Sequence, residues 1–238
     1  MPSVSSQSAR TQGTAATDGR PYLKIRYDTH EFPFVEKVKS IMGLSESSLA
    51  LLGDGSEHRE RWQRRNDQAS QWHRDFYDRF AELRPDYLRL IAGPVRDFMG
   101  EDFYYQAVPT FRVHLPRNVA VGEFHTDGQY GHPVGELSFW TPLTRAWDTN
   151  SVWVERNRGE GDYEAVEAAP GDIAVFNAVE LRHGNRENTT GSTRVSFDFR
   201  CVPTRLYSPG DSVSINTGMK FEPGDYYNAN MMAGSTND

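Results

Sequence analysis

The chain has 238 residues, of which 37% are hydrophobic and 25% charged, a length that suits a single domain with a substantial apolar core. No apolar run approaches the roughly eighteen residues that a membrane span needs, and a net charge of −7 argues against a nucleic-acid partner. The single cysteine, Cys201, excludes an intrachain disulfide and is consistent with a reducing cytoplasm, where we expect the protein to work.

The N-terminal part of the chain is predicted to be helical after a short arm. Residues 1–20 are rich in small and polar side chains and lack the apolar stretch of a secretory signal, so we expect a disordered arm. Residues 21–101 are mostly helical by periodicity, with helices over 34–42, 57–83 and 86–99, the second ending before Arg84-Pro85. Basic residues gather only at 58–65, which we interpret as a solvated helix face and not a phosphate-binding patch.

From residue 102 onward the pattern changes to short β-rich runs separated by Gly, Pro, Asn and Asp, which is typical of an antiparallel sandwich or barrel. The predicted strands are residues 103–115, 119–124, 136–143, 151–155, 163–168, 172–176 and 193–202. Together with the helices they would form one domain over residues 21–238. Residues 204–238 are expected to be an irregular C-terminal extension, although Tyr226 and Tyr227 offer a means of covering the core.

The most informative segment contains His125 and Asp127. Residues two apart on an extended backbone point the same way, so these two side chains can bind one metal ion. A third ligand is available in His183, which follows the apolar strand at residues 172–176. Two imidazoles and one carboxylate on one face of an ion form the facial triad typical of non-haem iron(II) oxygenases, which leaves the opposite face open for chemistry.

A carboxylate-binding pair is predicted on the strand at residues 193–202. Its even-numbered positions are polar and Val195, Phe197 and Phe199 are apolar, so one face would line a polar pocket. The open positions of a facial triad suit a bidentate 2-oxo acid and dioxygen, and the distal carboxylate of that acid needs a cation in the pocket. Arg194 offers a planar fork for this carboxylate, and the Ser196 hydroxyl can donate a further hydrogen bond to it.

In these motifs the sequence resembles the 2-oxoglutarate/iron(II) dioxygenases, whose His-x-Asp, distal His and Arg-x-Ser pattern reads here as His125-Thr-Asp127, His183 and Arg194-Val-Ser196. A closer resemblance, within residues 103–203, is to the small oxygenase-like proteins of streptomycin biosynthesis, of the StrG type. It rests on the segments HTDGQYGHPVGE, NSVWVE, LRHGN and TRVSFDFR.

The resemblance implies a fold and a set of cofactors. The fold is a double-stranded β-helix, a jelly-roll core over residues 102–203 with helices packed outside. The cofactor is iron(II), with 2-oxoglutarate and dioxygen as co-substrates and with succinate and carbon dioxide as co-products. Neighbouring halogenases lack the metal carboxylate, so the presence of Asp127 argues against halogenation.

Further side chains are candidates for substrate contacts by strand parity or nearness to the motifs: Glu123, Trp140, Asn150, Trp153 and Asp198. For Asp198, a salt bridge to Arg112 or Arg200 is an equally valid interpretation. His132 lies in a predicted turn and is interpreted as a loop residue or a substrate contact. His114 is interpreted as a hydrogen-bonded core histidine.

The predicted activity is oxidation of a C–H bond of a small polar substrate, most simply hydroxylation, in an amino-acid-derived or antibiotic pathway. Desaturation, cyclisation and epimerisation use the same oxidant and stay open as alternatives. A zinc hydrolase on a cupin-like barrel is a rival, because two His and an Asp also suit zinc, but Arg194 and Ser196 would then have no assigned purpose. The second rival is a non-catalytic jelly-roll that binds a carboxylated ligand or partner and retains the triad only as structure.

Overall fold

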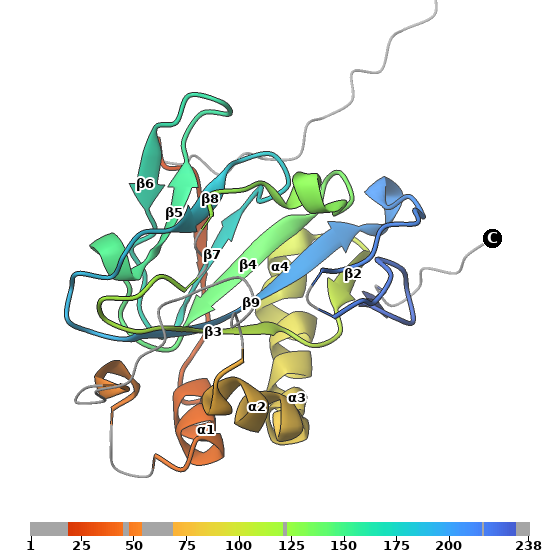
Figure 1. Cartoon of the computed structure of the whole chain (residues 1–238). Coiled ribbons are helices and arrows are strands. Elements are labelled where there is room, and N and C mark those ends of the chain that lie inside the picture. Colours follow the sequence, from red (N-terminus) through yellow and green to blue (C-terminus); the bar gives the residue numbers. More distant parts are fainter. Residues whose placement is uncertain (1–18, 45–47, 54–68, 121–122, 216, 232–238) are drawn as a thin grey trace, which may run out of the picture.

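The computed structural model of the chain describes residues 19–44, 48–53, 69–120, 123–215 and 217–231. These residues form two antiparallel sheets with helices packed on one side (Figure 1). The large, seven-stranded sheet has the order β1-β7-β4-β9-β2-β10, with β3 also paired to β9, and the small sheet has the order β6-β5-β8. The prediction of a mainly β chain with N-terminal helices is confirmed at this level. Within the described ranges, no helix combines the length and the apolar character needed to cross a lipid bilayer.

The elements have the following bounds. The large sheet contains β1 (Leu23–Arg26), β2 (Phe103–Gln106), β3 (Thr110–His114), β4 (Leu137–Pro142), β7 (Asp172–Phe176), β9 (Arg194–Pro203) and β10 (Tyr227–Asn230). The small sheet contains β5 (Val152–Glu155), β6 (Tyr163–Ala165) and β8 (His183–Asn185). The helices are α1 (Phe34–Ile41), α2 (Gln71–Asp78), α3 (Phe80–Leu90) and α4 (Arg96–Met99), with a π-helical turn at Ile91–Val95. Short 3-10 turns occupy Leu49–Leu51, Asp127–Tyr130, Asp148–Asn150 and Thr204–Leu206.

Strand β9 runs through the centre of the molecule and separates two layers. Its odd-numbered residues face the helices, where Phe34 of α1 packs edge-on against Phe197 with ring centroids 5.2 Å apart. Tyr87 of α3 packs in the same way against Phe199 at 5.3 Å. Successive side chains of a strand point to opposite faces, so the even-numbered residues of β9 face away from the helices. The helices therefore seal one face of the large sheet and leave the other face for the small sheet and a polar site.

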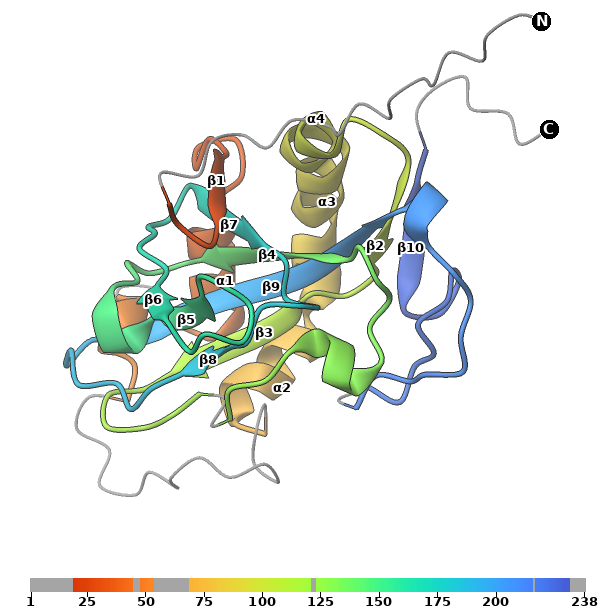
Figure 2. The same ribbon diagram turned by 90° about the horizontal axis from the view of Figure 1, so that it is seen from above.

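A smaller apolar cluster joins the two sheets. Trp140 of β4 and Phe176 of β7 pack in it with Val152 and Val154 of β5. The small sheet thus covers part of the face that the helices leave open, and strands β5, β6 and β8 lie in front of β4 and β9 when the molecule is seen from above (Figure 2). No residue of β9 belongs to this cluster, so the polar side chains on the even positions of β9 are not part of the apolar contact between the sheets.

The helical region departs from prediction at Pro85. Helix α3 runs through this proline, and the break falls at Arg79, between α2 and α3. A proline inside a helix costs about 3 kcal/mol, whereas burying Leu83 and Leu90, both 0% exposed, gains about 2 kcal/mol each. Burial of these side chains against the sheet therefore outweighs the tendency of proline to end a helix. Residues 1–18 of the predicted arm, and residues 57–68 of the predicted second helix with the basic cluster, lie outside the described residues.

The predicted strand at residues 103–115 is in fact two strands, β2 and β3, which pair with successive parts of β9. Tyr105 lies opposite Cys201 and Thr110 opposite Asp198, so the chain bulges between them. Pro109 in this bulge has no N–H with which to continue the ladder. The predicted strand at residues 119–124 is also wrong for its described part, where no strand forms.

The C-terminal segment is more regular than predicted. Residues Tyr227–Asn230 form β10, which pairs with β2 and adds an edge strand to the large sheet. Tyr226 and Tyr227 join Val202 and Phe221 in a third apolar cluster. The expected irregular extension is therefore wrong for this stretch, whose tyrosines do cover the core.

Candidate metal centre and adjoining pocket

Backbone pairing brings the predicted metal ligands together. His125 and His183 form an antiparallel bridge, with N–H to carbonyl distances of 3.0 Å and 2.8 Å in the two directions. Asp127 then donates its N–H to the carbonyl of Ala178 at 2.8 Å. The next residue, Gly128, approaches so closely that a Cβ there would lie 2.7 Å from the Val179 carbonyl oxygen. Residues 125–128 therefore run along residues 178–183.

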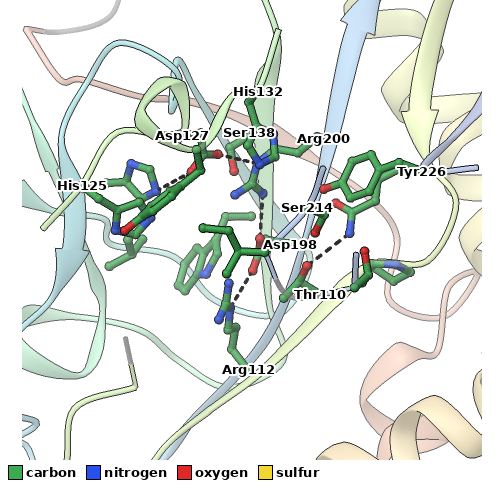
Figure 3. A pocket seen from close by; sticks show the side chains of 18 of the residues that line it. Thr110, Arg112, His125, Asp127, His132, Ser138, Asp198, Arg200, Ser214 and Tyr226 are labelled. Atoms are coloured by element: carbon green, nitrogen blue, oxygen red, sulfur yellow. Dashed lines mark hydrogen bonds and ion pairs between the residues drawn. The ribbon is translucent and has the colours of Figure 1, made fainter. Parts of the chain in front are cut away.

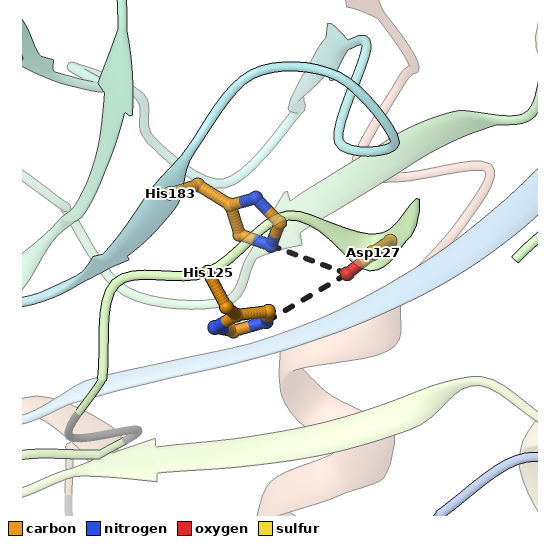
Figure 4. A group of neighbouring side chains, drawn as sticks. All are labelled: His125, Asp127 and His183. Carbon is orange, nitrogen blue, oxygen red and sulfur yellow. Dashed lines mark ion pairs between the residues drawn. The ribbon is translucent and has the colours of Figure 1, made fainter. Parts of the chain in front are cut away.

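The backbone that carries Asp127 differs from the expected strand. It is extended at Thr126, with φ −108° and ψ 145°, but Asp127 begins a 3-10 turn. The turn is closed by a capping box, in which the Gln129 side chain accepts from the Thr126 N–H at 3.1 Å. His125 and Asp127 still direct their side chains to one point, because the backbone stays extended up to the residue between them (Figure 4).

The two imidazoles converge on one carboxylate oxygen. Oδ1 of Asp127 lies 3.7 Å from Nε2 of His125 and 3.5 Å from Nε2 of His183. The opposite ring nitrogens, Nδ1, lie 2.8 Å and 3.1 Å from the carbonyl oxygens of Glu123 and Leu181. A carbonyl only accepts, so each Nδ1 carries the proton and each Nε2 presents its electron pair to the centre. This is the tautomer that a metal ligand requires.

Electrostatics keep His125 and Asp127 in metal-binding form at neutral pH. Burial, together with the neighbouring His183, lowers the pKa of His125 to about 4, so its ring is neutral. Burial alone would raise the pKa of Asp127, but the guanidinium of Arg200 holds it well below its ordinary value. The centre therefore offers a neutral imidazole and an ionised carboxylate together.

A cavity of about 720 Å³ adjoins the centre. Its wall is built by the polar face of the large sheet, by β8 and by the C-terminal segment, which contributes Ser214, Thr217 and Tyr226. Figure 3 shows the labelled side chains of this wall, with His125 and Asp127 at one end and Tyr226 and Ser214 at the other. A volume of this size holds a small organic co-substrate together with part of a second molecule.

Arg194 lies in this wall and is 1% exposed. Its three donor nitrogens bind the carbonyl of Asn150 at 3.1 Å, the hydroxyl of Ser196 at 2.9 Å and the amide oxygen of Asn185 at 2.7 Å. All three acceptors are neutral, and within the described part of the chain Arg194 takes part in no ion pair. Burial and the nearby Arg112 lower its pKa to about 9, which reflects the cost of a buried cation without an anion.

Ser196 itself is fully buried and does not line the cavity. It acts on Arg194 as an acceptor, which the sequence argument did not anticipate. Asn185 was also missed, although it stands in the LRHGN segment, two residues after His183 on the same strand face. This spacing is the signal that would have found it.

Asp198 makes both of the salt bridges that the sequence left open. Its Oδ1 lies 3.3 Å from Nε of Arg112, and its Oδ2 accepts from Nη1 of Arg200 at 2.7 Å. Arg200 in turn donates from Nε to Oδ2 of Asp127 at 2.7 Å. Arg200 was considered only as a partner of Asp198, yet its even position on β9 places it on the polar face with Arg194.

The other substrate candidates divide into two groups. Glu123, Trp140 and Asp198 line the cavity. Asn150 does not, because it is 0% exposed and its side chain accepts from the backbone N–H of Trp147 at 2.8 Å. Trp153 also lies outside the wall, since the alternation of β5 turns Val152 into the cavity and Trp153 away from it. Asn150 and Trp153 thus do not face this cavity, in contrast to Glu123, Trp140 and Asp198.

The two remaining histidines have defined partners. His114 is fully buried, and its Nε2 lies 2.9 Å from the carbonyl of Asn118, so it is the core histidine that we predicted. His132 lines the cavity, and its Nδ1 lies 2.6 Å from Oε1 of Glu136. Glu136 is 0% exposed and also accepts from the hydroxyl of Tyr227.

No family model matches the chain. The streptomycin biosynthesis protein StrG of Streptomyces griseus is 37% identical over 206 residues, which span 87% of this chain and 97% of that protein. Among solved structures, the non-haem alpha-ketoglutarate-dependent carbocyclase SnoK of nogalamycin biosynthesis matches with a TM-score of 0.52 and 17% identity, over 89% of this chain and 93% of that one. HygX from Streptomyces hygroscopicus, with nickel and 2-oxoglutarate bound, matches with a TM-score of 0.38 and 17% identity, over 84% and 90% of the two chains.

The likeness to SnoK concerns the fold alone, because so few residues are shared. The likeness to StrG extends to the sequence over nearly all of both chains. It includes the stretch that carries the motifs quoted above, since the matched residues cover most of the chain. With this identity and coverage, the chain belongs to the StrG family.

Proposed function

We propose that the chain is a non-haem iron(II) oxygenase that uses 2-oxoglutarate and dioxygen to oxidise a C–H bond of a small polar substrate. One observation carries this proposal: a His-Asp-His group and a buried arginine that has no acidic partner among the described residues face the same cavity. Its relative StrG is a streptomycin biosynthesis protein, so we favour a natural-product intermediate as substrate. We further propose that the two facing sheets are the halves of a double-stranded β-helix.

The donor set fits iron(II). Nε2 of His125, Nε2 of His183 and Oδ1 of Asp127 would hold the ion, and the ligand atoms of the three residues lie within 4.8 Å of one another. Two imidazoles and one carboxylate are the ligands of the facial iron triad. Because backbone carbonyls already hold both Nδ1 protons, the imidazoles need no change of tautomer. When bound, iron(II) and 2-oxoglutarate supply the oxidising power for an unactivated C–H bond.

Arg194 would bind the distal carboxylate of 2-oxoglutarate. A buried guanidinium with neutral partners is costly, and a carboxylate ligand would offset that cost with bidentate, charge-assisted hydrogen bonds. Asn185 and Ser196 orient the guanidinium through their bonds to Nη2 and Nη1. The ring of Trp140, 5.5 Å from the Arg194 guanidinium, restricts it further.

The substrate would occupy the end of the cavity near Arg112, Asp198 and Tyr226. Both oxygens of the Asp198 carboxylate are already paired, one with Arg112 and one with Arg200. This wall is therefore polar, but Asp198 offers no unpaired carboxylate. A polar, internally neutral wall suits a small uncharged or weakly charged molecule. Hydroxylation is the simplest outcome for such a substrate. Desaturation, cyclisation and epimerisation use the same oxidant and stay open as alternatives.

The test is an anaerobic titration of the metal-free protein with iron(II) and then with 2-oxoglutarate. We expect the visible charge-transfer band of a 2-oxo acid chelated to iron(II). The band should be absent from His183→Ala, which removes one ligand. His30→Ala, which changes an exposed histidine outside the site, is the matched control and should keep the band.

Two results would contradict the proposal. Folded protein that binds iron(II) but shows no band would favour a carboxylate-binding protein without this chemistry. Folded protein that takes up zinc in preference to iron(II), and hydrolyses a substrate without consuming 2-oxoglutarate, would favour the zinc hydrolase. Circular dichroism of each variant establishes that loss of the band does not reflect unfolding.

A further inference from the structure

The two oxygens of the Asp127 carboxylate have different partners. Oδ1 faces the two imidazoles, as the dashed lines of Figure 4 show. Oδ2 points the other way and accepts the 2.7 Å hydrogen bond from Nε of Arg200. A carboxylate without such a partner can rotate and offer both oxygens to a metal ion. Here one oxygen is already engaged.

Arg200 is itself held in place from a second direction. Nη1 donates to Oδ2 of Asp198 at 2.7 Å, and Asp198 is paired on its other oxygen with Arg112. The three side chains form a line from the cavity wall to the metal centre, with Asp198 between the two arginines (Figure 3). Nε of Arg200 also lies 3.8 Å from Oε1 of Glu136. Carboxylates on several sides thus fix the guanidinium.

Burial makes this arrangement rigid. Arg200 is 8% exposed, Asp198 5% and Asp127 3%, so little solvent reaches the bonds between them. In such surroundings a broken hydrogen bond leaves a charged group without a partner, which is strongly unfavourable. Turning Oδ2 of Asp127 toward the metal centre would therefore break its hydrogen bond to Arg200 at a large cost in free energy.

We propose that Arg200 is a positioning residue that restricts Asp127 to binding the metal through Oδ1 alone. The inference rests on the proposed function, because it concerns the metal that this function requires. A carboxylate bound through both oxygens would occupy one coordination position more, and a bidentate 2-oxo acid would then compete for it. By holding Oδ2, Arg200 keeps that position available for the co-substrate.

The experiment uses cobalt(II) as a probe, because its visible d–d absorption depends on coordination number. In Arg200→Gln, we expect the cobalt(II) spectrum to differ from that of the wild type before any co-substrate is added. The metal-loaded variant should bind 2-oxoglutarate about tenfold more weakly or worse, the scale typical for partners of metal ligands. Arg200→Lys keeps a cationic donor near Oδ2 and should return both quantities toward the wild type.

Arg205→Gln is the matched control. Arg205 lies two residues after the end of β9 and pairs with Glu101 at 2.7 Å on the surface, so its loss also removes an arginine–carboxylate pair. This control should leave the spectrum and the 2-oxoglutarate affinity unchanged. If Arg200→Gln does not fold, Asp198→Asn takes its place, because it keeps the shape of Asp198 but weakens its hold on Arg200. The same directions are then expected.

The proposal is overturned if folded Arg200→Gln, or its substitute Asp198→Asn, has the cobalt(II) spectrum and 2-oxoglutarate affinity of the wild type. A purely structural role for Arg200 would lower the unfolding temperature without changing the spectrum. Failure of the proposed function looks different: the wild type itself would then show no chelate band with iron(II) and 2-oxoglutarate.

Discussion

The guanidinium of Arg194 binds the amide oxygen of Asn185 at 2.7 Å, deep between the two sheets. Asn185 is the last residue of β8, the strand that begins with His183. The predicted carboxylate clamp and a predicted metal ligand are thus joined through one short strand. Their relative position does not depend on the loops outside the pocket.

We expect Arg194→Lys to weaken 2-oxoglutarate binding while iron(II) binding stays close to that of the wild type. Lysine keeps the charge but loses the planar fork, and a lost charge-assisted hydrogen bond of about 1.5–3 kcal/mol corresponds to about 10- to 100-fold in affinity. Titration of the charge-transfer band measures the effect. Ser196→Ala, which removes one orienting contact, should cause a smaller loss, and equal affinities in all three proteins would exclude Arg194 from the co-substrate site.

Asp127→Gly should create a chloride-sensitive centre. Removing the carboxylate opens a coordination position and leaves Arg200 as a buried cation with one partner fewer, which favours an anion at that place. We expect chloride to shift the charge-transfer band of the variant and to leave that of the wild type unchanged. The proposed oxygenase activity should fall sharply. A variant that retains full oxygenase activity would show that Asp127 is not a metal ligand.

The stability of the protein should decrease between pH 6.5 and pH 4, in part because of His73. Burial, followed by the charges of Arg112 and Arg74, lowers its pKa from 6.5 to about 4 in the folded state. Above pH 6.5 the His73 imidazole is neutral in both the folded and the unfolded state, so it adds no pH dependence to the stability there. As the pH falls below 6.5, His73 binds a proton in the unfolded state but stays neutral in the folded state. This difference lowers the free energy of unfolding by about 2 kcal/mol at pH 5.

Urea unfolding at pH 7 and pH 5 measures this contribution. The wild type should lose about 2 kcal/mol more than His73→Gln between these two pH values. Equal losses would mean that the buried ring is protonated in the native state.

Phe197→Ala should destabilise the protein by about 3–5 kcal/mol, because Phe197 is 0% exposed on the helix-facing side of β9. Val134→Ala is the control, since Val134 is 75% exposed and its loss should cost less than about 0.5 kcal/mol. Denaturant unfolding compares the two variants. Similar values for both would contradict the assignment of the helix-facing core.

Much of the β core could be predicted because strand alternation is strong where one face is apolar and the other polar. The bounds predicted for β7 match those observed, and β9 differs by one residue at each end. The same alternation placed Arg194 and Asp198 on the polar face. Strands β1, β8 and β10 were missed because runs of three or four residues, such as His183–Asn185, are too short to show a period.

The differences between the predicted and the observed structure have a common physical cause. Contacts between residues far apart in the chain outweigh local conformational preferences. Pro85 is accommodated because neighbouring side chains of α3 are buried against the sheet. The bond from Arg200 to Asp127 joins residues far apart in the chain, and no local pattern reports it. Trp153 does not line the cavity, which could not be predicted because the alternation of side chains along a strand does not say which face of the strand meets a cavity.

Strand β10 has a practical consequence for handling the protein. It pairs along β2 and thereby caps an edge of the large sheet that would otherwise present unpaired backbone groups. A chain shortened before Tyr227 would uncover that edge and remove the hydroxyl that binds Glu136. Such a truncation should self-associate, which size-exclusion chromatography would show as an earlier elution.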